Sequence, residues 1–238
     1  MQTGLYVALS SQVALERRLA TLADNVANAG TAGFRAASVN FQDIVNGTGP
    51  DSVSFVTPGA PSVDVNAGGL RETKNPFDFA IRGDAWFALD TPAGTVVTRD
   101  GRFTMRETGE LVSIDGYPAL DAGGAPLLLD PLGGPPEVAA DGTLRQGDRL
   151  AGAIGLYAFS PPPDHARFGN SGFVAPDAQP VVDQPDIGVA QGFVEESNVN
   201  AVHQMMSLIQ VQRTFEQVTA LMSDSDTALK DAIKLLGA

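Results

Sequence analysis

Both ends of this chain carry a heptad-like stripe of apolar residues, and this feature limits the available folds more than any other. Near the N-terminus, apolar or small side chains recur three and four positions apart, with Gln12 filling one gap, at Leu5, Ala8, Leu15, Leu19, Leu22 and Val26. This spacing predicts an amphipathic helix over residues 5–28 that presents one face to another helix. Periodicity alone leaves an ordinary surface helix on a domain core equally open.

The C-terminal stripe is longer. It continues through Leu208, Val211, Phe215, Val218, Met222, Leu229, Ala232 and Leu236, with Ser225 filling one position. Ser197 or Asn198 provides an N-cap, and Asp226 and Lys230 form a helix-stabilising i,i+4 pair. At about 1.5 Å per residue, a helix over 198–236 reaches about 58 Å. A body of this size does not cover such a helix, so its stripe needs another helix.

The region between the helices has a different pattern. Residues 36–76 contain the turn signals NGTGPDS and TPGAPS and predict an extended, irregular connector. From residue 77 onward, short alternating runs are separated by turns, including the Asp-Gly pairs at 100, 115 and 141.

These patterns predict an α+β chain with a β-rich antiparallel body, sandwich or barrel-like, and long terminal helices that pair as a coiled coil. The predicted segments are an N-terminal helix over 1–35, a connector over 36–76, the body over 77–190 and a C-terminal helix over 191–238.

Composition excludes several classes of protein. The net charge of −13, with 15 Lys and Arg scattered along the chain, argues against binding to nucleic acid. No apolar run approaches the roughly 20 residues of a membrane-spanning helix. The N-terminus has no basic stretch before its apolar residues, which argues against a cleaved secretory signal. The absence of cysteine excludes disulfides and Cys-ligated zinc.

No constellation of catalytic residues is recognisable. The only histidines, His165 and His203, lack a metal-ligand partner three or four positions away. Glu195 and Glu196 resemble an acid pair, but adjacent residues on an extended strand point apart. We therefore expect no enzymatic activity, no cofactor and no metal.

Three motifs identify a family. Residues 22–35 read LADNVANAGTAGFR, residues 192–200 read GFVEESNVN, and the body carries FAIRGDAWF at 79–87 followed by TRDGRF at 98–103. Together they resemble the flagellar rod and hook family, in the family's order and over nearly the whole chain. Ala85-Trp86-Phe87 departs from the family's usual Gly-Phe-Phe, which we interpret as drift that keeps an aromatic side chain.

The residue types of the first motif have a physical reason. Asn25 and Asn28 lie on one helix face, where their amides can bond another helix or the connector. Thr31 and Gly33 allow a sharp exit, with Gly33 at positive φ. Phe34 is expected to anchor the connector against the helices. A plain helix C-cap followed by a loop explains the glycines but not the whole string.

The resemblance implies a structural subunit of the flagellar basal-body rod, the drive shaft that crosses the periplasm. It further implies export through the flagellar type III apparatus, without a cleaved signal, and partners that are other rod proteins and copies of the same chain. Within the family, the chain length leaves the distal rod protein and its proximal relative as candidates, and the opening GLYVALS at 4–10 more closely resembles the proximal one. The alternatives are the distal rod protein, a secreted β-domain binding module and a rod-associated peptidoglycan-cleaving enzyme.

The resemblance and the stripes also predict which residues matter. The subunit-interface residues are expected to be Leu5, Leu15, Leu19, Leu22, Asn25, Val26, Asn28, Leu208, Val211, Phe215, Val218, Met222, Leu229 and Leu236. The motif and connector residues are Thr31, Gly33, Phe34, Ser197, Asn198, Val199 and Asn200.

Overall fold

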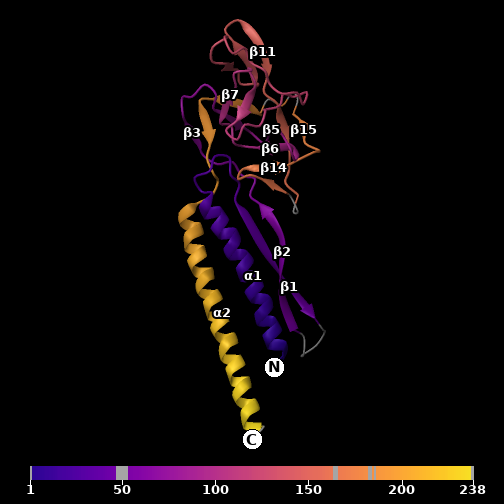
Figure 1. Cartoon of the computed structure of the whole chain (residues 1–238), viewed down its shortest axis with the longest axis vertical. Helices are drawn as coiled ribbons and strands as arrows, with labels where there is room; N and C mark the ends of the chain where they lie inside the picture. Colours follow the sequence, from indigo (N-terminus) through magenta and orange to yellow (C-terminus); the bar gives the residue numbers. More distant parts are fainter. Residues whose placement is uncertain (1, 47–52, 163–165, 182–183, 185, 237–238) are drawn as a thin grey trace. The chain divides into compact units, whose positions relative to one another are not determined.

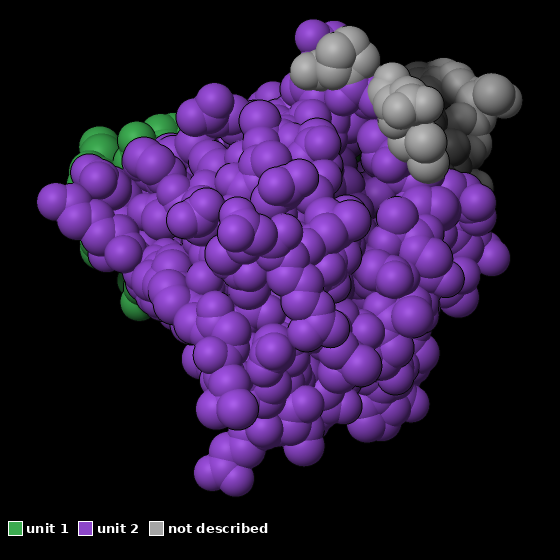
Figure 2. Space-filling model, turned by 90° about the horizontal axis from the view of Figure 1, so that it is seen from above, with its two compact units in different colours: residues 1–27, 37–63, 200–238 green, residues 28–36, 64–199 purple. Residues whose placement is uncertain are grey.

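The chain folds into two compact units, each built from segments far apart in the sequence. The structure is a computed structural model that describes residues 2–46, 53–162, 166–181, 184 and 186–236. Unit 1 comprises residues 1–27, 37–63 and 200–238, and unit 2 comprises 28–36 and 64–199 (Figure 2). The chain therefore passes between the units after residues 27, 36, 63 and 199.

Unit 1 contains the two helices. Helix α1 (Gln2–Ala27) and helix α2 (Ala201–Leu236) occupy the two predicted helical segments and lie side by side (Figure 1). Ala14 of α1 and Val211 of α2 are buried, and Gln12 Nε2 donates a hydrogen bond of 3.4 Å to Thr219 Oγ1. The predicted ion pair between Asp226 and Lys230 is present at 2.5 Å. No helix in the described ranges is long and apolar enough to cross a bilayer.

A two-stranded antiparallel sheet completes unit 1. Strand β1 (Ala37–Asn46) pairs with β2 (Val53–Val63) from Ala37 opposite Val63 to Asn46 opposite Val53, with a register shift between Val39 and Phe41. Both strands contact α1. A regular two-stranded sheet thus occupies part of residues 36–76, where the sequence predicted an irregular connector.

The motif TPGAPS, predicted to be a loop, lies inside β2. Proline lacks a backbone donor and is confined to edge strands. In a two-stranded sheet every strand is an edge, so Pro58 and Pro61 are tolerated opposite Phe41 and Val39. Of the other predicted turn, NGTGPDS, residues 47–52 lie outside the described residues.

Unit 2 is the β-rich body. Its largest sheet follows the order β13 (Arg167–Phe168), β14 (Gly172–Val174), β6 (Gly94–Thr98), β5 (Trp86–Thr91), β12 (Leu156–Ala158) and β15 (Gln179–Pro180). A second sheet has the order β11 (Arg149–Ala153), β10 (Thr143–Gln146) and β9 (Glu137–Val138). Three two-stranded sheets pair β16 (Gly188–Gln191) with β4 (Phe79–Arg82), β17 (Phe193–Glu195) with β3 (Leu70–Glu72), and β7 (Phe103–Met105) with β8 (Leu111–Ser113).

All of these pairings are antiparallel, so the fold is α+β with an antiparallel β-rich body, as the sequence predicts. One apolar core supports the body. Its largest side chains include Phe79, Phe87 and Phe103, all at most 1% exposed. The rings of Phe87 and Phe103 meet edge to face at 5.4 Å, a favoured aromatic geometry.

Two of the three Asp-Gly pairs form the predicted turns. Gly116 and Gly142 have φ of 86°, and Gly142 lies between the paired strands β9 and β10. The prediction for Asp100-Gly101 is wrong, since β6 and β7 belong to different sheets and Gly101 has no positive φ. A Cβ on Gly101 would lie 1.7 Å from the carbonyl oxygen of Phe79, so close backbone approach explains this glycine.

Candidate functional site

The segment that follows α1 enters unit 2 through a tight, hydrogen-bonded turn. Thr31 N donates to the carbonyl of Asn28 at 3.1 Å, and Thr31 Oγ1 bonds Asn28 Oδ1 at 3.2 Å. Gly33 has φ of 68°, as predicted, and its N–H donates to the carbonyl of Glu195 at 2.9 Å. A Cβ at Gly33 would lie 2.3 Å from the backbone nitrogen of Asp100. The position therefore requires glycine for both conformation and space.

Phe34 anchors this segment in the β body. Its side chain is buried within unit 2, and the guanidinium of Arg167 lies 4.7 Å from the centre of its ring. Arg167 Nη2 also donates to the carbonyl of Arg35 at 2.8 Å. The expectation that Phe34 packs the connector onto the helices is wrong, because residues 28–36 fold with the body.

A buried cluster of charges lies next to this turn. Glu195 accepts hydrogen bonds from Arg35 Nη2 at 2.5 Å, Arg99 Nη1 at 3.2 Å and the backbone N–H of Gly68 at 2.9 Å. The side chains of Arg35 and Glu195 are fully buried, and that of Arg99 is 2% exposed. Two cations and one carboxylate leave this cluster with one net positive charge.

Aromatic and backbone groups accommodate the excess charge. The guanidinium carbons of Arg35 and Arg99 lie 5.6 and 5.3 Å from the centre of the Trp86 ring, within cation–π range. Arg99 Nη2 donates to the carbonyl of Gly83 at 2.8 Å. Burial lowers the pKa of Arg99, and the attraction of Glu195 opposes that shift. Among aromatic side chains, tryptophan is the strongest cation–π partner.

Asn198 joins three stretches of unit 2. Its Oδ1 accepts from the N–H of Ala36 at 2.7 Å, and its Nδ2 donates to the carbonyls of Asp64 at 2.9 Å and Asn66 at 3.0 Å. The amide therefore ties together the segments beside three of the points where the chain leaves or enters the unit. The sequence offered Asn198 as an N-cap of α2, but its side-chain amide makes these contacts instead.

The helix cap belongs to a neighbouring residue. Asn200 Oδ1 accepts from the N–H of His203 at 3.0 Å, three residues into the helix, which is N-cap geometry. Ser197 does not cap the helix either: its Oγ accepts from the N–H of Val199 at 3.2 Å. The first turn of α2 thus begins after a locally bonded Ser-Asn-Val-Asn string.

Asn25 performs a similar task inside unit 1. Its Oδ1 accepts from the N–H of Ala37 at 2.9 Å, and its Nδ2 donates to the carbonyl of the same residue at 2.8 Å. Asn25 is buried, so the bidentate bond fixes the first residue of β1 against α1. One asparagine holds Ala36 within unit 2 and another holds Ala37 within unit 1.

The predicted stripe residues are partly covered within the chain. In the described part, Val211 is buried, while the following are half-buried: Leu15, Leu19, Leu22, Val26, Leu208, Phe215, Val218 and Met222. The side chains of Leu5, Leu229 and Leu236 lie outside what the structure describes.

A second apolar set on the same helices faces solvent. Within the described residues it comprises Tyr6, Leu9 and Val13 on α1 and Val202, Met205, Met206, Ile209 and Leu221 on α2. Residues 202, 205, 206 and 209 follow the spacing of a single helix face. The sequence analysis did not identify these residues, because it considered a single apolar stripe on each helix.

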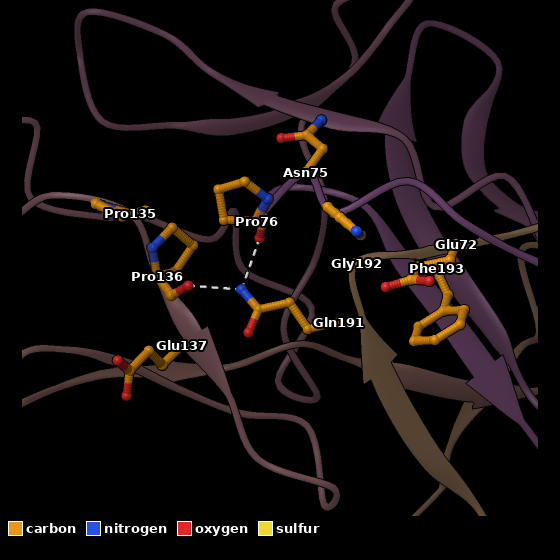
Figure 3. Close-up of a pocket in the computed structure, with 10 residues that line it drawn as sticks. Glu72, Asn75, Pro76, Pro135, Pro136, Glu137, Gln191, Gly192 and Phe193 are labelled. Atoms are coloured by element: carbon orange, nitrogen blue, oxygen red, sulfur yellow. Dashed lines mark hydrogen bonds between the residues drawn. The ribbon is translucent and has the colours of Figure 1, made fainter.

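One groove of unit 2 is lined by residues that form no recognisable catalytic set. The groove in Figure 3, of about 380 Å³, is lined mainly by proline and polar residues of unit 2. The side-chain amide of Gln191 is occupied there by the carbonyls of Pro76 at 2.7 Å and Pro136 at 2.6 Å. Among the described residues, no group of three His, Asp or Glu side chains could hold a metal ion.

Sequence reasoning missed the charge cluster, although one signal was present. Glu195 and Glu196 do point apart, as expected for a strand: Glu195 is buried, whereas Glu196 pairs with exposed Arg71 at 3.2 Å and is 53% exposed. Alternation therefore placed one glutamate in the interior. Its cations, Arg35 and Arg99, lie 160 and 96 positions away in the sequence and could not be assigned from spacing.

Comparison with known families agrees with this architecture. Residues 5–35 match the family of flagella basal body rod proteins, residues 80–145 match the D1 domain of the flagellar hook protein FlgE/F/G family, and residues 190–235 match the C-terminal region of the flagellar basal body rod FlgEFG proteins. The three matched segments, which include both helical ends and part of the β body, place the chain in the class of flagellar rod and hook proteins.

Individual relatives show which member of this class the chain resembles. The chain is 62% identical to the flagellar basal-body rod protein FlgF of Mesorhizobium japonicum and 54% identical to FlgF of Rhizobium meliloti, in each case over 100% of this chain and 99% of the relative. It is 27% identical to the rod protein FlgG of Bacillus subtilis, over 99% of both chains. The chain belongs to the FlgF family of flagellar basal-body rod proteins.

Proposed function

We propose that this chain is a structural subunit of the flagellar basal-body rod and that it assembles with neighbouring subunits through the outer faces of α1 and α2. The proposed assembly surface rests on one observation. Tyr6, Met206, Leu221 and the rest of the second apolar set remain exposed although each helix already buries an inner face within unit 1. Family membership supports the structural role, because the relatives are named as rod proteins.

The exposed apolar residues of α1 and α2 offer a surface that a neighbouring subunit can bury. Contiguous exposed apolar surface usually marks a site that a partner covers. Burial of apolar area contributes roughly 25 cal/mol per Å², and a subunit in an assembly uses such faces repeatedly. Both helical ends of this chain match models of rod-protein families, so the proposed partner is another member of the family or a second copy of this chain.

The predicted stripe residues are also proposed to contact neighbouring subunits. Leu19, Leu22 and Phe215 are half-buried in the chain, so each has surface left for a neighbour. Helix α1 has 26 residues and α2 has 36. A coiled coil between them is proposed for the assembled rod, where neighbouring helices complete the cover over α2.

The proposal also covers where the subunit lies and how it reaches that position. The subunit occupies the proximal rod in the periplasm and transmits torque through many parallel interfaces. It reaches that position through the flagellar type III export apparatus without a cleaved signal. The distal rod is the alternative position, and the lower identity to FlgG than to the FlgF relatives favours the proximal one.

The test is a charge placed on the exposed apolar face. Met206→Asp should leave the melting temperature of the isolated protein within about 2 °C of wild type, because Met206 is 67% exposed. It should nevertheless abolish incorporation into basal bodies and swimming. Gln210→Asp is the matched control, since Gln210 is an exposed polar residue of the same helix. Normal swimming and incorporation of Met206→Asp would contradict the proposed assembly surface.

A further inference from the structure

The buried cluster around Glu195 links segments that are remote in the sequence. Arg35 belongs to the segment that follows α1, Arg99 follows β6, and Glu195 ends β17 shortly before α2. Arg35 and Glu195 are 160 positions apart. Contacts formed in the folded body, and not chain connectivity, therefore bring these groups together.

We propose that Glu195 is the positioning residue that docks both terminal connectors, residues 28–36 and 195–199, into the β body. The step from docked connectors to rod assembly rests on the proposed function. The docking itself is a property of the isolated chain.

Electrostatics make Glu195 decisive within the cluster. Arginine remains protonated in proteins, so neither Arg35 nor Arg99 can lose its charge to suit a buried site. With Glu195 the cluster has a net charge of +1, shared with the Trp86 ring. Without the carboxylate it holds two buried cations and, among the described residues, no buried counter-charge, since Asp84, 3.8 Å from Arg99, is 87% exposed. Removal of one partner from a buried pair is strongly destabilising.

In the absence of the Glu195 carboxylate, repulsion between the two buried arginines is most easily relieved by releasing the connector at 28–36, which carries Arg35. The backbone of this connector bonds mainly to the other one: Gly33 N to the carbonyl of Glu195 at 2.9 Å, Asn198 N to the carbonyl of Phe34 at 3.3 Å, and Ala36 N to Asn198 Oδ1 at 2.7 Å. The two connectors thus hold each other, and loss of one removes the partners of the second.

A third stretch depends on the same residue. The N–H of Gly68 donates to Glu195 Oε1 at 2.9 Å, and the N–H of Glu196 donates to the carbonyl of Gly69 at 2.8 Å. Strand β3, which follows, pairs with β17 only within the described sheets. The central six-stranded sheet includes none of these segments. Arg167 of β13 contacts Phe34 and Arg35, so release of the connectors is expected to affect that edge of the sheet and to leave the pairing of β5 with β6 intact.

One consequence concerns the order of folding. Arg35 precedes Glu195 in the chain, so the N-terminal connector has no docking partner until the last part of the body is available. A chain that ends before residue 195 should form the sheet around β5 and β6 and leave residues 28–36 undocked. The subunit becomes complete only when both ends are present.

The test is hydrogen exchange measured by mass spectrometry on the full-length isolated protein. Glu195→Gln should raise exchange at least tenfold in peptides that cover residues 28–36 and 64–72, and leave peptides over residues 86–98 unchanged. Glu196→Gln is the matched control, because the neighbouring Glu196 is exposed and paired with Arg71 on the surface. It should leave every peptide unchanged.

A second variant separates charge from shape. Arg35→Met combined with Glu195→Gln restores the net charge of +1 and should recover most of the lost protection at 64–72. If Glu195→Gln does not fold, recovery of folding by the double variant supports the same conclusion. Three results overturn the proposal: exchange equal to that of Glu196→Gln, a uniform rise over the whole body, or failure of both variants to fold.

Swimming of cells that carry each variant distinguishes this inference from the proposed function. Unchanged exchange in Glu195→Gln, with rod assembly intact, overturns the docking role and leaves the rod function in place. Failure of the wild-type chain to restore swimming to cells that lack it overturns the rod function whatever the exchange data show.

Discussion

The two units of this chain differ in how many of their apolar side chains they bury. Unit 2 encloses a core with completely buried side chains such as Phe79, although it also exposes single ones such as Leu132. Among the described side chains of unit 1, the buried apolar ones are Ala14 and Val211, and larger ones such as Met206 are more than half exposed. A body with an enclosed core is stable by itself, whereas helices with an uncovered apolar face are completed by partners. Under the proposed function, unit 2 is complete in the isolated subunit, and neighbouring subunits cover the exposed helix faces of unit 1.

The largest expected effect comes from the turn that enters unit 2. Gly33→Val and Gly33→Ala should both abolish swimming, because any Cβ meets the backbone of Arg99 and Asp100 at 2.3–2.4 Å and φ is 68°. Backbone strain alone is worth about 1–3 kcal/mol, and the clash adds to it. Melting temperature and swimming should be measured together.

Gly30→Ala is the control for this substitution. Gly30 is exposed and has no atom within 4 Å of a built Cβ, so the variant should match wild type in both measurements. If Gly33→Ala swims normally, the turn is not required and the connector does not depend on it.

A smaller effect is expected at Asn198, which tests whether unit 2 depends on its connectors. Asn198→Ala removes the acceptor for the N–H of Ala36 and the donors to Asp64 and Asn66. Hydrogen bonds of this kind contribute roughly 0.5–1.5 kcal/mol each, and three are lost, so unfolding in urea should show a loss of roughly 1–3 kcal/mol. Asn66→Ala, at an exposed position, should lose much less. Equal losses for the two variants would contradict the role of the Asn198 amide.

The smallest effect concerns pH and the core of unit 2. Tyr157 donates a hydrogen bond to the carbonyl of Asp121, and burial raises the pKa of its phenol above the usual value. The fold therefore favours the neutral phenol. Its contribution is fully present below the unfolded pKa of about 10 and is lost as pH rises through the raised pKa of the folded state.

Tyr157→Phe should consequently weaken the fold by about 0.5–1.5 kcal/mol at neutral pH and flatten the fall in stability above pH of about 10. Urea unfolding at several pH values measures both. An alkaline fall as steep as that of wild type would show that Tyr157 is not its source.

The elements of this fold were largely predictable from sequence. Heptad spacing identifies both helical segments, and Asp115-Gly116 and Asp141-Gly142 mark turns whose glycines take positive φ. The hairpin β1–β2 was not predicted, because Pro58 and Pro61 indicate a loop unless the strand is known to be an edge. Asn198 was expected to cap α2, since local sequence cannot show that its amide binds segments more than 130 positions away.

The candidate site was harder to predict than the elements. Gly33, Asn25 and the motif around Asn198 were selected from the sequence. Arg99, Arg167 and Trp86 were not, because their roles follow from long-range packing around Glu195 and Phe34. The exposed second face of the helices was also missed. A single seam accounts for the heptad spacing, and only the burial of each side chain reveals what remains uncovered.

Hydrogen exchange of the isolated monomer and of assembled rods tests the contrast between the units most directly. In the monomer, amides of β5 and β6 should exchange at least about 100-fold more slowly than those of α2 over residues 208–228, because an enclosed core opens only with global unfolding. In assembled rods the helix should become as protected as the sheet. Equal protection of helix and sheet in the monomer, with no gain on assembly, would contradict the account.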